Sequence, residues 1–151
     1  MHNLVILENI RSAYNVGNIV RTADSLGREV WIVGYTPSPL THPKVLKTSL
    51  WAEQNVGIKQ FDFSHDAIEY AKNLWYQVIA AELTDQAIDL RNFQPEKEHL
   101  AIIFGNEVEG VLEHTLQEVD AVVKIPMQWI KESMNIGQST AIFMRELGKE
   151  K

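Results

Sequence analysis

The sequence of 151 residues contains no cysteine. This absence excludes disulfide bonds, catalytic thiolates and cysteine-ligated zinc, and it makes an intracellular, cytoplasmic location the simplest expectation. The five histidines are scattered and show neither the HxxxH nor the HExxH spacing of zinc enzymes. We therefore expect a protein without a metal site.

The sequence also lacks a long apolar run and an excess of positive charge. No stretch approaches the length of a transmembrane helix, and the opening MHNLVILENI has no basic segment of the kind that begins a signal peptide. No membrane association is expected. The formal net charge of −6 argues against capture of nucleic acid over the whole surface, so contact with RNA would need a local basic patch.

The composition that is present is typical of a globular protein. Hydrophobic residues make up 45% and charged residues 23% of the chain, so residues 1–151 can bury the core of one domain. Continuous apolar runs predict strands at 3–8, 29–35, 77–83, 99–105 and 121–125. Helical periodicity alternates with them, and the last helix is expected at 134–147. This order predicts an α/β fold with a parallel sheet and helices on both faces.

Ligands of such sheets bind beyond the carboxyl ends of the strands. That rule selects residues 8–15, 81–84, 105–110 and 126–135, most of which are rich in polar residues and glycine. The sequence therefore predicts a functional site built from these loops.

The segment NVGNIVRTADSLG, residues 15–27, has apolar residues at helical spacing, with Asn15 suited to the N-cap and Gly27 to the position after the helix. Gly17 in the first turn costs about 1 kcal/mol relative to alanine, so a close approach of backbone or ligand is expected there. Arg21 lies on the polar face. A solvated surface arginine and a functional one both fit that position.

The segment IIFGNEVEGV, residues 102–111, places two acids between Gly105, at the end of a strand, and Gly110, which is expected to open a helix. It matches neither GxGxxG nor the P-loop, because Val111 stands where a P-loop has lysine. Glu107 and Glu109 disfavour a phosphate ligand and suit a neutral or cationic one, such as a sulfonium or an amine. An ordinary turn with an acid near a helix start is the plainer alternative.

The segment KIPMQWIKESMNIGQSTAIFMREL, residues 124–147, ends a strand at Pro126 and then brings Ser133 and Asn135 to the start of the last helix. One side chain is enough to cap a helix. If Ser133 is the cap, Asn135 has no capping role. Two polar side chains at one helix start therefore indicate a site.

Taken together and in order, these segments resemble the SpoU (TrmH-like) family of RNA 2′-O-ribose methyltransferases, in the SPOUT superfamily. The first is similar to the family motif N-x-G-x-x-x-R-T-A, the second to a strand followed by G-x-E-x-x-G, and the third to I-P-M followed by S-[LM]-N. Each motif alone is modestly specific. All three occur at the family's spacing across nearly the whole chain.

The resemblance implies a C-terminal deep trefoil knot and a homodimer whose active site is assembled at the interface. It also implies S-adenosylmethionine as the cofactor, bent and held largely by backbone groups of three loops. The residues implied to bind the cofactor are Ala81, Leu83, Gly105, Ile125, Met127 and Met134.

The implied reaction is methyl transfer to a ribose 2′-hydroxyl of RNA, with tRNA favoured over rRNA. That hydroxyl is a weak acid, so the site must help to remove its proton and align it with the sulfonium methyl. Arg21 would be the central residue, although a guanidinium stays protonated and suits an RNA phosphate or a developing alkoxide better than the role of a base. Ser133 and Asn135 would orient the ribose, and Asn15 and Glu107 would position Arg21 and the loops.

Three departures from the family pattern concern the shape of the cofactor loop and the substrate. Trp129 replaces a common glycine, NIGQSTAI replaces a smaller apolar run, and SLWAEQNV replaces a small-residue pattern. The basic residues expected to contact RNA are Arg11, Arg21, Arg28, Lys44, Lys47 and Lys131. A solvated surface is the alternative for Lys44 and Lys47.

Two other functions stay open at this point. A catalytically silent knotted dimer that binds RNA or a protein partner would fit Trp129 and the negative charge, but the intact motif residues oppose it. A flavodoxin-like binding module would fit the strand–helix alternation and would leave the three polar segments unexplained.

Overall fold

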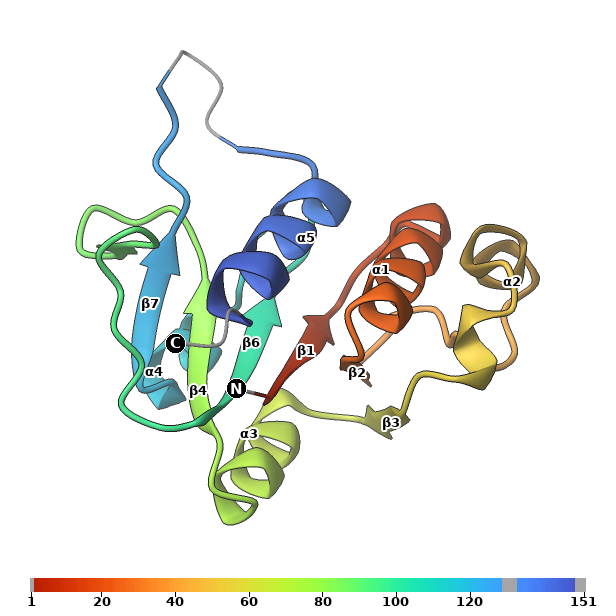
Figure 1. The fold of residues 1–151 in the computed structure, drawn as a ribbon, viewed down its shortest axis with the longest axis horizontal. Coiled ribbons are helices and arrows are strands. Elements are labelled where there is room, and N and C mark those ends of the chain that lie inside the picture. Colours follow the sequence, from red (N-terminus) through yellow and green to blue (C-terminus); the bar gives the residue numbers. More distant parts are fainter. Residues whose placement is uncertain (1, 129–132, 149–151) are drawn as a thin grey trace.

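Seven strands form one parallel sheet in the computed structural model, which describes residues 2–128 and 133–148. The order across the sheet is β3-β2-β1-β6-β4-β7-β5 (Figure 1). Trp129 and Lys131, both singled out from the sequence, lie outside the described residues. The strands are β1 (His2–Glu8), β2 (Glu29–Val33), β3 (Ile58–Phe61), β4 (Gln77–Ala81), β5 (Ile88–Asp89), β6 (His99–Phe104) and β7 (Ala121–Lys124).

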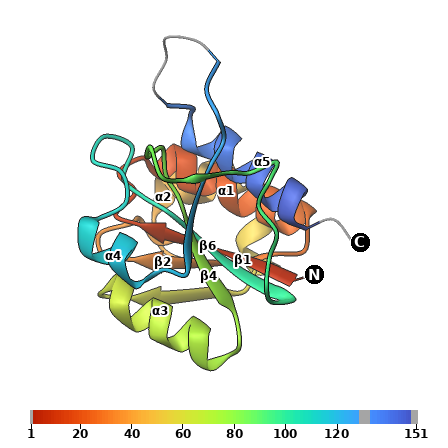
Figure 2. The same cartoon turned by 90° about the vertical axis from the view of Figure 1, so that its left-hand side faces the viewer.

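Helices cover both faces of this sheet, as the sequence predicts. Figure 2 shows α1, α2 and α5 on one side of the strands and α3 and α4 on the other. The helices are α1 (Ala13–Ser25), α2 (Pro43–Ser49), α3 (Ser64–Asn73), α4 (Glu113–Glu118) and α5 (Ile136–Leu147), with a short 3₁₀ helix, η1 (Ala52–Gln54).

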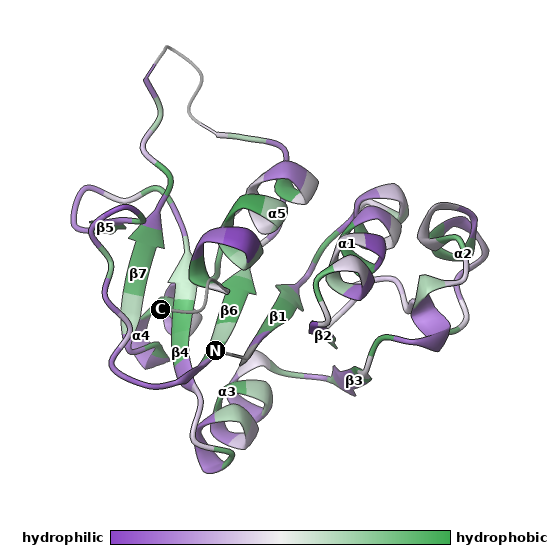
Figure 3. Ribbon diagram, viewed as in Figure 1, coloured by the Kyte–Doolittle hydropathy of each residue, from purple (hydrophilic) through white to green (hydrophobic). Residues whose placement is uncertain are grey.

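The central strands are buried on both faces, which explains their continuous apolar sequence. In β1, Val5 and Leu7 belong to the core under α1 and α5, whereas Leu4 and Ile6 belong to the core under α3. All four side chains are fully buried, and burial of each contributes about 1.5–3 kcal/mol. Figure 3 shows the same contrast between apolar strands and helices of mixed polarity.

The register brings the carboxyl ends of four strands to one edge. Phe104 of β6 pairs with Leu7 of β1 and with Ala81 of β4, and Ala81 pairs with Val123 of β7. The residues that follow these strands, at 8–15, 81–84, 105–110 and 126–128, therefore leave the sheet at the same edge.

Glycine at position 17 is explained by helix packing. A side chain there would lie 2.8 Å from the carbonyl oxygen of Val45 and would collide with Thr48, both on α2. The expected close approach at Gly17 is therefore confirmed, and the group that approaches is the backbone and side chain of α2. Gly27, just after α1, has a φ of +63°, as expected for the position after a helix end.

The predicted helix starts near Asn15 and Gly110 are wrong. Helix α1 begins at Ala13, and its N-cap is Ser12, not Asn15, since the Ser12 hydroxyl accepts from the Asn15 N–H at 3.1 Å. Gly110 does not open a helix. It has a φ of +74° and bridges back to Asn106, and α4 begins at Glu113.

The sequence analysis missed two strands at the edges of the sheet. β3 has two exposed residues between half-buried ends, and β5 is only two residues long. Neither has the continuous apolar run of a buried strand, which was the signal used to predict the others.

Candidate active site

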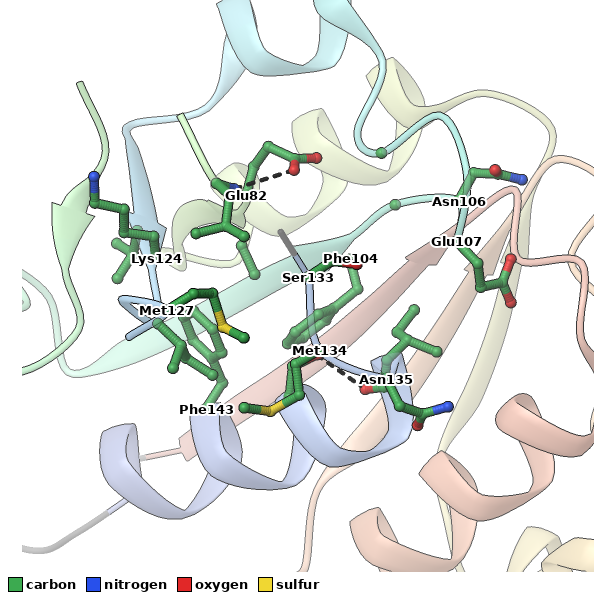
Figure 4. A pocket seen from close by; sticks show the side chains of 18 of the residues that line it. Glu82, Phe104, Asn106, Glu107, Lys124, Met127, Ser133, Met134, Asn135 and Phe143 are labelled. Carbon is green, nitrogen blue, oxygen red and sulfur yellow. Dashed lines mark hydrogen bonds between the residues drawn. The ribbon is translucent and has the colours of Figure 1, made fainter. Parts of the chain in front are cut away.

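A cavity of about 1040 Å³ opens at the carboxyl ends of β4, β6 and β7 (Figure 4). Its walls come from the residues after β4, the 105–110 loop after β6, the end of β7 and the start of α5. Asn15 of α1 completes the lining. These are the loops that the strand-end rule selected, and the fold brings them together from segments more than 100 residues apart.

The apolar wall of the cavity is formed by β6 and α5. The rings of Phe104 and Phe143 meet edge to face, with centroids 5.5 Å apart and an interplanar angle of 87°. Such pairs are worth about 0.5–1.5 kcal/mol beyond their buried area. The pair fixes α5 against the sheet, and Figure 4 shows Met127 and Met134 beside it.

All six residues expected to bind the cofactor line this cavity. They come from the three expected loops and are Ala81, Leu83, Gly105, Ile125, Met127 and Met134. Lining the cavity is their observed position, and contact with a cofactor stays a prediction.

The loop after β6 is held by the side chain of Asn106. Its oxygen accepts from the N–H groups of Val108 and Glu109 at 2.8 and 2.9 Å. Its nitrogen donates to the Asn9 carbonyl and the Tyr35 hydroxyl, both at 2.9 Å. The loop is therefore tied both to itself and to the residue that follows β1.

Gly105 is required by the same loop. A side chain at Gly105 would collide with the backbone of Gly110 and Val111, which folds back over it. Because backbone cannot move aside as a flexible side chain can, this position accepts only glycine without a shift of the loop.

Glu82 lies inside the stretch from Ala81 to Leu83 that was expected to bind the cofactor, and its carboxylate has a structural role that was not predicted. Its carboxylate accepts from the Val111 N–H at 2.8 Å and from the Leu83 N–H at 3.1 Å. It therefore joins the loop after β4 to the loop after β6. Its place directly after Ala81, inside the selected 81–84 range, was the signal that could have identified it.

Four of the five residues expected to carry the chemistry also line the cavity: Asn15, Glu107, Ser133 and Asn135. The side-chain nitrogen of Asn135 lies 3.4 Å from the side-chain oxygen of Asn15. This contact joins the first and third motifs. Ser133 and Asn135 are both exposed at the cavity mouth.

The capping roles at the start of α5 are the reverse of those expected. Asn135 is the N-cap, and its side-chain oxygen accepts from the Gly137 and Gln138 N–H groups at 2.9 and 3.4 Å. The expectation that Asn135 has no capping role was wrong, because the helix begins two residues later than predicted. Ser133 is the polar side chain that the helix does not use.

Glu107 anchors the start of α1 to the loop after β6. Its two carboxylate oxygens accept from the Arg11 and Ser12 N–H groups at 3.0 and 3.2 Å. Burial by itself raises the pKa of the Glu107 carboxyl. The hydrogen bonds from Arg11, Ser12 and the Asn15 side chain outweigh burial and hold that pKa below its ordinary value.

Arg21 is the expected residue that the fold does not bring to the cavity. Its side chain is exposed on α1, and it is not among the described residues that line the cavity. Arg28 also lies elsewhere, since it is half-buried and its guanidinium donates to the Gly148 carbonyl at 3.4 Å. Burial lowers the pKa of Arg28.

The charge in the cavity is negative. Among the described lining residues, Glu82, Glu107 and Glu109 are acidic and Lys124 is the basic one. The Lys124 ammonium donates to the Thr84 carbonyl at 3.1 Å. The cavity therefore suits a neutral or cationic ligand better than a phosphate.

One cluster in the described part of the chain, His65, Asp66 and Glu69 on α3, has the side chains to hold a metal ion. All three are exposed, and His65 instead lies 2.8 Å from Glu118. The cluster is on the helix layer opposite α5. None of the helices in residues 2–128 and 133–148 is long and apolar enough to cross a membrane.

The carboxyl ends of the strands in a parallel α/β sheet are where small ligands usually bind, and the acidic, partly apolar cavity lies there. The chain belongs to the SpoU rRNA methylase family, whose model matches residues 2–145.

Two relatives indicate the range of similarity. The tRNA (guanosine(18)-2′-O)-methyltransferase of Thermus thermophilus is 30% identical over 148 residues, which cover 97% of this chain and 74% of that protein. The enzyme of the same name from Escherichia coli K12 is 26% identical over 149 residues, which cover 97% of this chain and 63% of that protein.

The fold matches that of an rRNA methyltransferase from Sinorhizobium meliloti solved with AdoMet bound. The TM-score is 0.89 and the identity 25%, and the match covers 97% of this chain and 55% of that one. The chain therefore spans between about half and three quarters of the length of these similar proteins.

Proposed function

We propose that this chain is an S-adenosylmethionine-dependent methyltransferase that modifies the ribose 2′-hydroxyl of RNA, with tRNA favoured over rRNA. The observation that supports this most is the meeting of all three motif loops around one acidic cavity. The activity named for the Thermus and Escherichia relatives agrees with it.

The cavity fits S-adenosylmethionine in size and in charge. Its volume of about 1040 Å³ is at the upper end for small-molecule sites. Aromatic and methionine side chains offer surface to an adenine ring, and Glu82, Glu107 and Glu109 complement the positive charge of a sulfonium. When bound, this cofactor supplies the activated methyl group.

The cofactor would be held by the residues of the three loops that line the cavity. Backbone groups at Ala81, Leu83 and Gly105 would hold the ligand from one side. Ile125, Met127 and Met134 would pack on its apolar parts. Gly105 keeps the loop after β6 close to the cavity floor, which fixes the position of the donors on that loop.

The residues at the cavity mouth would bind and orient the ribose. Ser133, released from capping, is free to hydrogen-bond the sugar, and Asn135 is held rigidly by its bonds to the start of α5. Asn15 would position Asn135, and Glu107 would hold the Arg11–Ser12 backbone beside them. Alignment of this kind accounts for a large part of catalysis in transfer reactions.

Arg21 would act from a second copy of the chain. Its exposed position outside its own cavity fits a homodimer in which α1 of one protomer completes the site of its partner. There a protonated guanidinium can hold a substrate phosphate or the alkoxide that develops as the hydroxyl loses its proton.

Mixed dimers test this arrangement. Arg21→Ala and Ser133→Ala proteins, each impaired alone, should recover activity when refolded together, because one of the two sites then has both residues. Failure to recover, or full activity in a protein that light scattering shows to be monomeric, would contradict the shared site.

We also propose that the C-terminal segment is threaded as a deep knot. β7 lies between β4 and β5, so the chain that leaves β4, forms β5 and returns to β6 passes around it. The Leu90 N–H donates to the Lys124 carbonyl at 2.8 Å, which holds this loop on β7, and α5 then returns to pack on α1 and β1. A crystal structure in which residues 125–135 pass outside the 82–98 loop would contradict the threading.

Residues 1–151 would work as one methyltransferase domain in the cytoplasm, where tRNA is modified. The two cores share the same sheet, so unfolding should show one cooperative transition. Two separate transitions, or recovery of the protein with membranes on cell fractionation, would contradict these two proposals.

The reaction is tested with labelled S-adenosylmethionine and separate pools of unmodified tRNA and rRNA. We expect label in one pool and its loss with Arg21→Ala. Calorimetry with S-adenosylmethionine should show that both proteins bind the cofactor. Absence of both label and cofactor binding in the wild-type protein would overturn the proposed function.

A further inference from the structure

A second hollow, of about 540 Å³, lies between the start of α1 and α2. It is lined by residues 11–14 on one side and by α2 on the other, and Figure 1 shows these two helices side by side. None of the residues discussed for the cofactor lines it. The described residues that line it are Arg11, Ser12, Ala13, Tyr14, Pro37, His42, Lys44, Lys47 and Thr48.

The charge of this hollow is opposite to that of the chain. Arg11, Lys44 and Lys47 line it, and none of its described lining residues is acidic. Within residues 2–128 and 133–148, none of these three cations forms an ion pair with a carboxylate. On a protein of net charge −6, three unpaired cations around one hollow mark a place suited to an anion.

The walls of the hollow are held in place by helix packing. The Thr48 hydroxyl lies 3.4 Å from the Tyr14 carbonyl, and the absence of a side chain at Gly17 lets α2 approach α1. The His42 ring accepts from the Lys44 N–H at 3.3 Å, which fixes the start of α2. The cations therefore lie on backbone segments whose relative position is fixed by the packing of α1 on α2.

An aromatic ring stands at the edge of the same hollow. Tyr14 is 63% exposed although it belongs to the first turn of α1. A large exposed ring beside unpaired cations has little value for folding. It is the combination with which proteins bind single-stranded nucleic acid, because the cations contact phosphates and the ring stacks on a base.

The hollow adjoins the cofactor cavity through one short segment. The backbone N–H groups of Arg11 and Ser12 donate to Glu107, which lines the cavity, and the same two residues line the hollow. Asn15, one residue after Tyr14, lines the cavity again. The cavity and the hollow are therefore neighbours, so one RNA strand can contact both.

We propose that this hollow binds the single-stranded RNA next to the methylated nucleotide. Arg11, Lys44 and Lys47 hold a phosphodiester, and Tyr14 stacks on the neighbouring base. The proposal rests on the proposed function for the choice of RNA as the anion, and it adds where and how that RNA is held.

Fluorescence anisotropy with a short, unmodified single-stranded RNA of mixed sequence tests the proposal. Lys44→Ala/Lys47→Ala should weaken binding about tenfold and reduce the slope of log affinity against log salt by about one to two. Tyr14→Ala should weaken binding about tenfold and leave the slope unchanged, and Tyr14→Phe should bind like the wild type.

The matched control is Lys59→Ala/Lys97→Ala, which removes the same charge elsewhere. Lys59 lies over the Tyr70 ring on the α3 side, and Lys97 donates to the Tyr76 carbonyl. This control should change neither affinity nor slope. In the transfer assay, the loss in Lys44→Ala/Lys47→Ala should fall on KM for RNA, with affinity for S-adenosylmethionine retained.

The possible results distinguish failure of the proposed RNA subsite from failure of the proposed methyl-transfer reaction. Equal affinity and salt slope for the two double variants, with methyl transfer intact, would overturn the hollow as an RNA subsite and leave the reaction standing. Loss of RNA binding confined to the hollow variants, with no methyl transfer by the wild type, would support the hollow and count against the reaction. A wild-type protein that does not bind this short RNA would overturn the hollow as an RNA subsite, and the transfer assay with tRNA and rRNA would still decide the reaction.

Discussion

The cavity at the strand ends and the hollow between α1 and α2 share a short wall and have opposite charge. The larger one, at the strand ends, is lined by three glutamates and one lysine, whereas the smaller one, between α1 and α2, is lined by three cations and no described acid. The segment 11–15 faces both. The backbone N–H groups of residues 11 and 12 donate to Glu107 on the acidic side, and Arg11 and Tyr14 are among the residues that line the basic side.

This difference shows how little net charge says about a binding site. A chain of net charge −6 still presents a basic hollow, because its negative charge lies elsewhere, including in the cavity next to it. The arrangement matches the two reactants of the proposed transfer, since a sulfonium is positive and an RNA strand is negative.

Arg21→Ala should have the largest effect, because Arg21 is a cation that lines neither hollow of its own chain. Methyl transfer should fall at least 10²- to 10³-fold, as when one donor to a developing charge is removed. Binding of S-adenosylmethionine should persist. Arg21→Lys, which keeps the charge and loses the planar fork, should remain impaired, and Arg91→Ala, which breaks an exposed pair with Asp89, is the control. Activity of Arg21→Ala near that of Arg91→Ala would remove Arg21 from the site.

Gly105→Ala should damage the acidic cavity and spare the basic one. The new side chain collides with the backbone of Gly110 and Val111, and overpacking of this kind costs about 1–3 kcal/mol. Calorimetry should show weakened cofactor binding, while the RNA affinity measured by anisotropy stays unchanged. Gly27→Ala, where no atom lies within 4 Å but φ is +63°, is the matched control, with strain of about 1 kcal/mol and normal cofactor binding. Equal cofactor affinity in the two variants would argue against a cofactor at this loop.

The two polar residues before α5 should have different roles, with Asn135 stabilising the helix and Ser133 acting in methyl transfer. Asn135→Ala should lose about 1 kcal/mol of stability with its cap, whereas Asn135→Ser should keep the cap and lose only the amide that reaches Asn15. Ser133→Ala should leave the melting temperature unchanged and reduce methyl transfer. Thermal melts and transfer rates of the three variants test this division, and a destabilised Ser133→Ala would reverse it.

Glu107 should give the smallest effect, visible as a pH dependence of stability. Because its pKa is lowered in the folded state, its stabilising contribution is present above the unfolded value and is lost as the pH falls through the folded value. Glu107→Gln should therefore be less stable than the wild type at pH 7, by less than about 1 kcal/mol because the carboxylate is partly exposed. Denaturant titrations should show the difference shrinking below about pH 4. A difference that is constant from pH 7 to pH 3 would mean that the carboxylate is not stabilised as its contacts indicate.

The sheet was predictable because burial on both faces leaves a strong pattern. Runs such as Leu4–Leu7 are apolar at every position since both sides of β1 are covered. The edge strands β3 and β5 carry no such signal. Helix starts were less predictable, because caps were inferred from apolar spacing, and the first turn of α1 bonds to Glu107, which is far away in the sequence.

The candidate cavity was predictable from the strand-end rule and the three motifs, which selected its loops and ten of its lining residues. The role of Glu82 was not, because its partner Val111 lies 29 positions away and is reached only in the fold. The position of Arg21 was also not predictable, since a helical wheel shows which face of a helix a residue lies on and not which residues lie near it. Only the cations of the basic hollow were predicted to contact RNA. That Tyr14 and His42 line the same hollow was not predicted.

The central claim is that the acidic cavity presents a methyl donor to a ribose of RNA. The most direct measurement is mass spectrometry of nucleosides released from unmodified tRNA after reaction with methyl-deuterated S-adenosylmethionine. We expect the label on the 2′-oxygen of a ribose, and its absence with Arg21→Ala. A label on a base, or unlabelled tRNA and rRNA from a protein that binds the cofactor, would contradict the account.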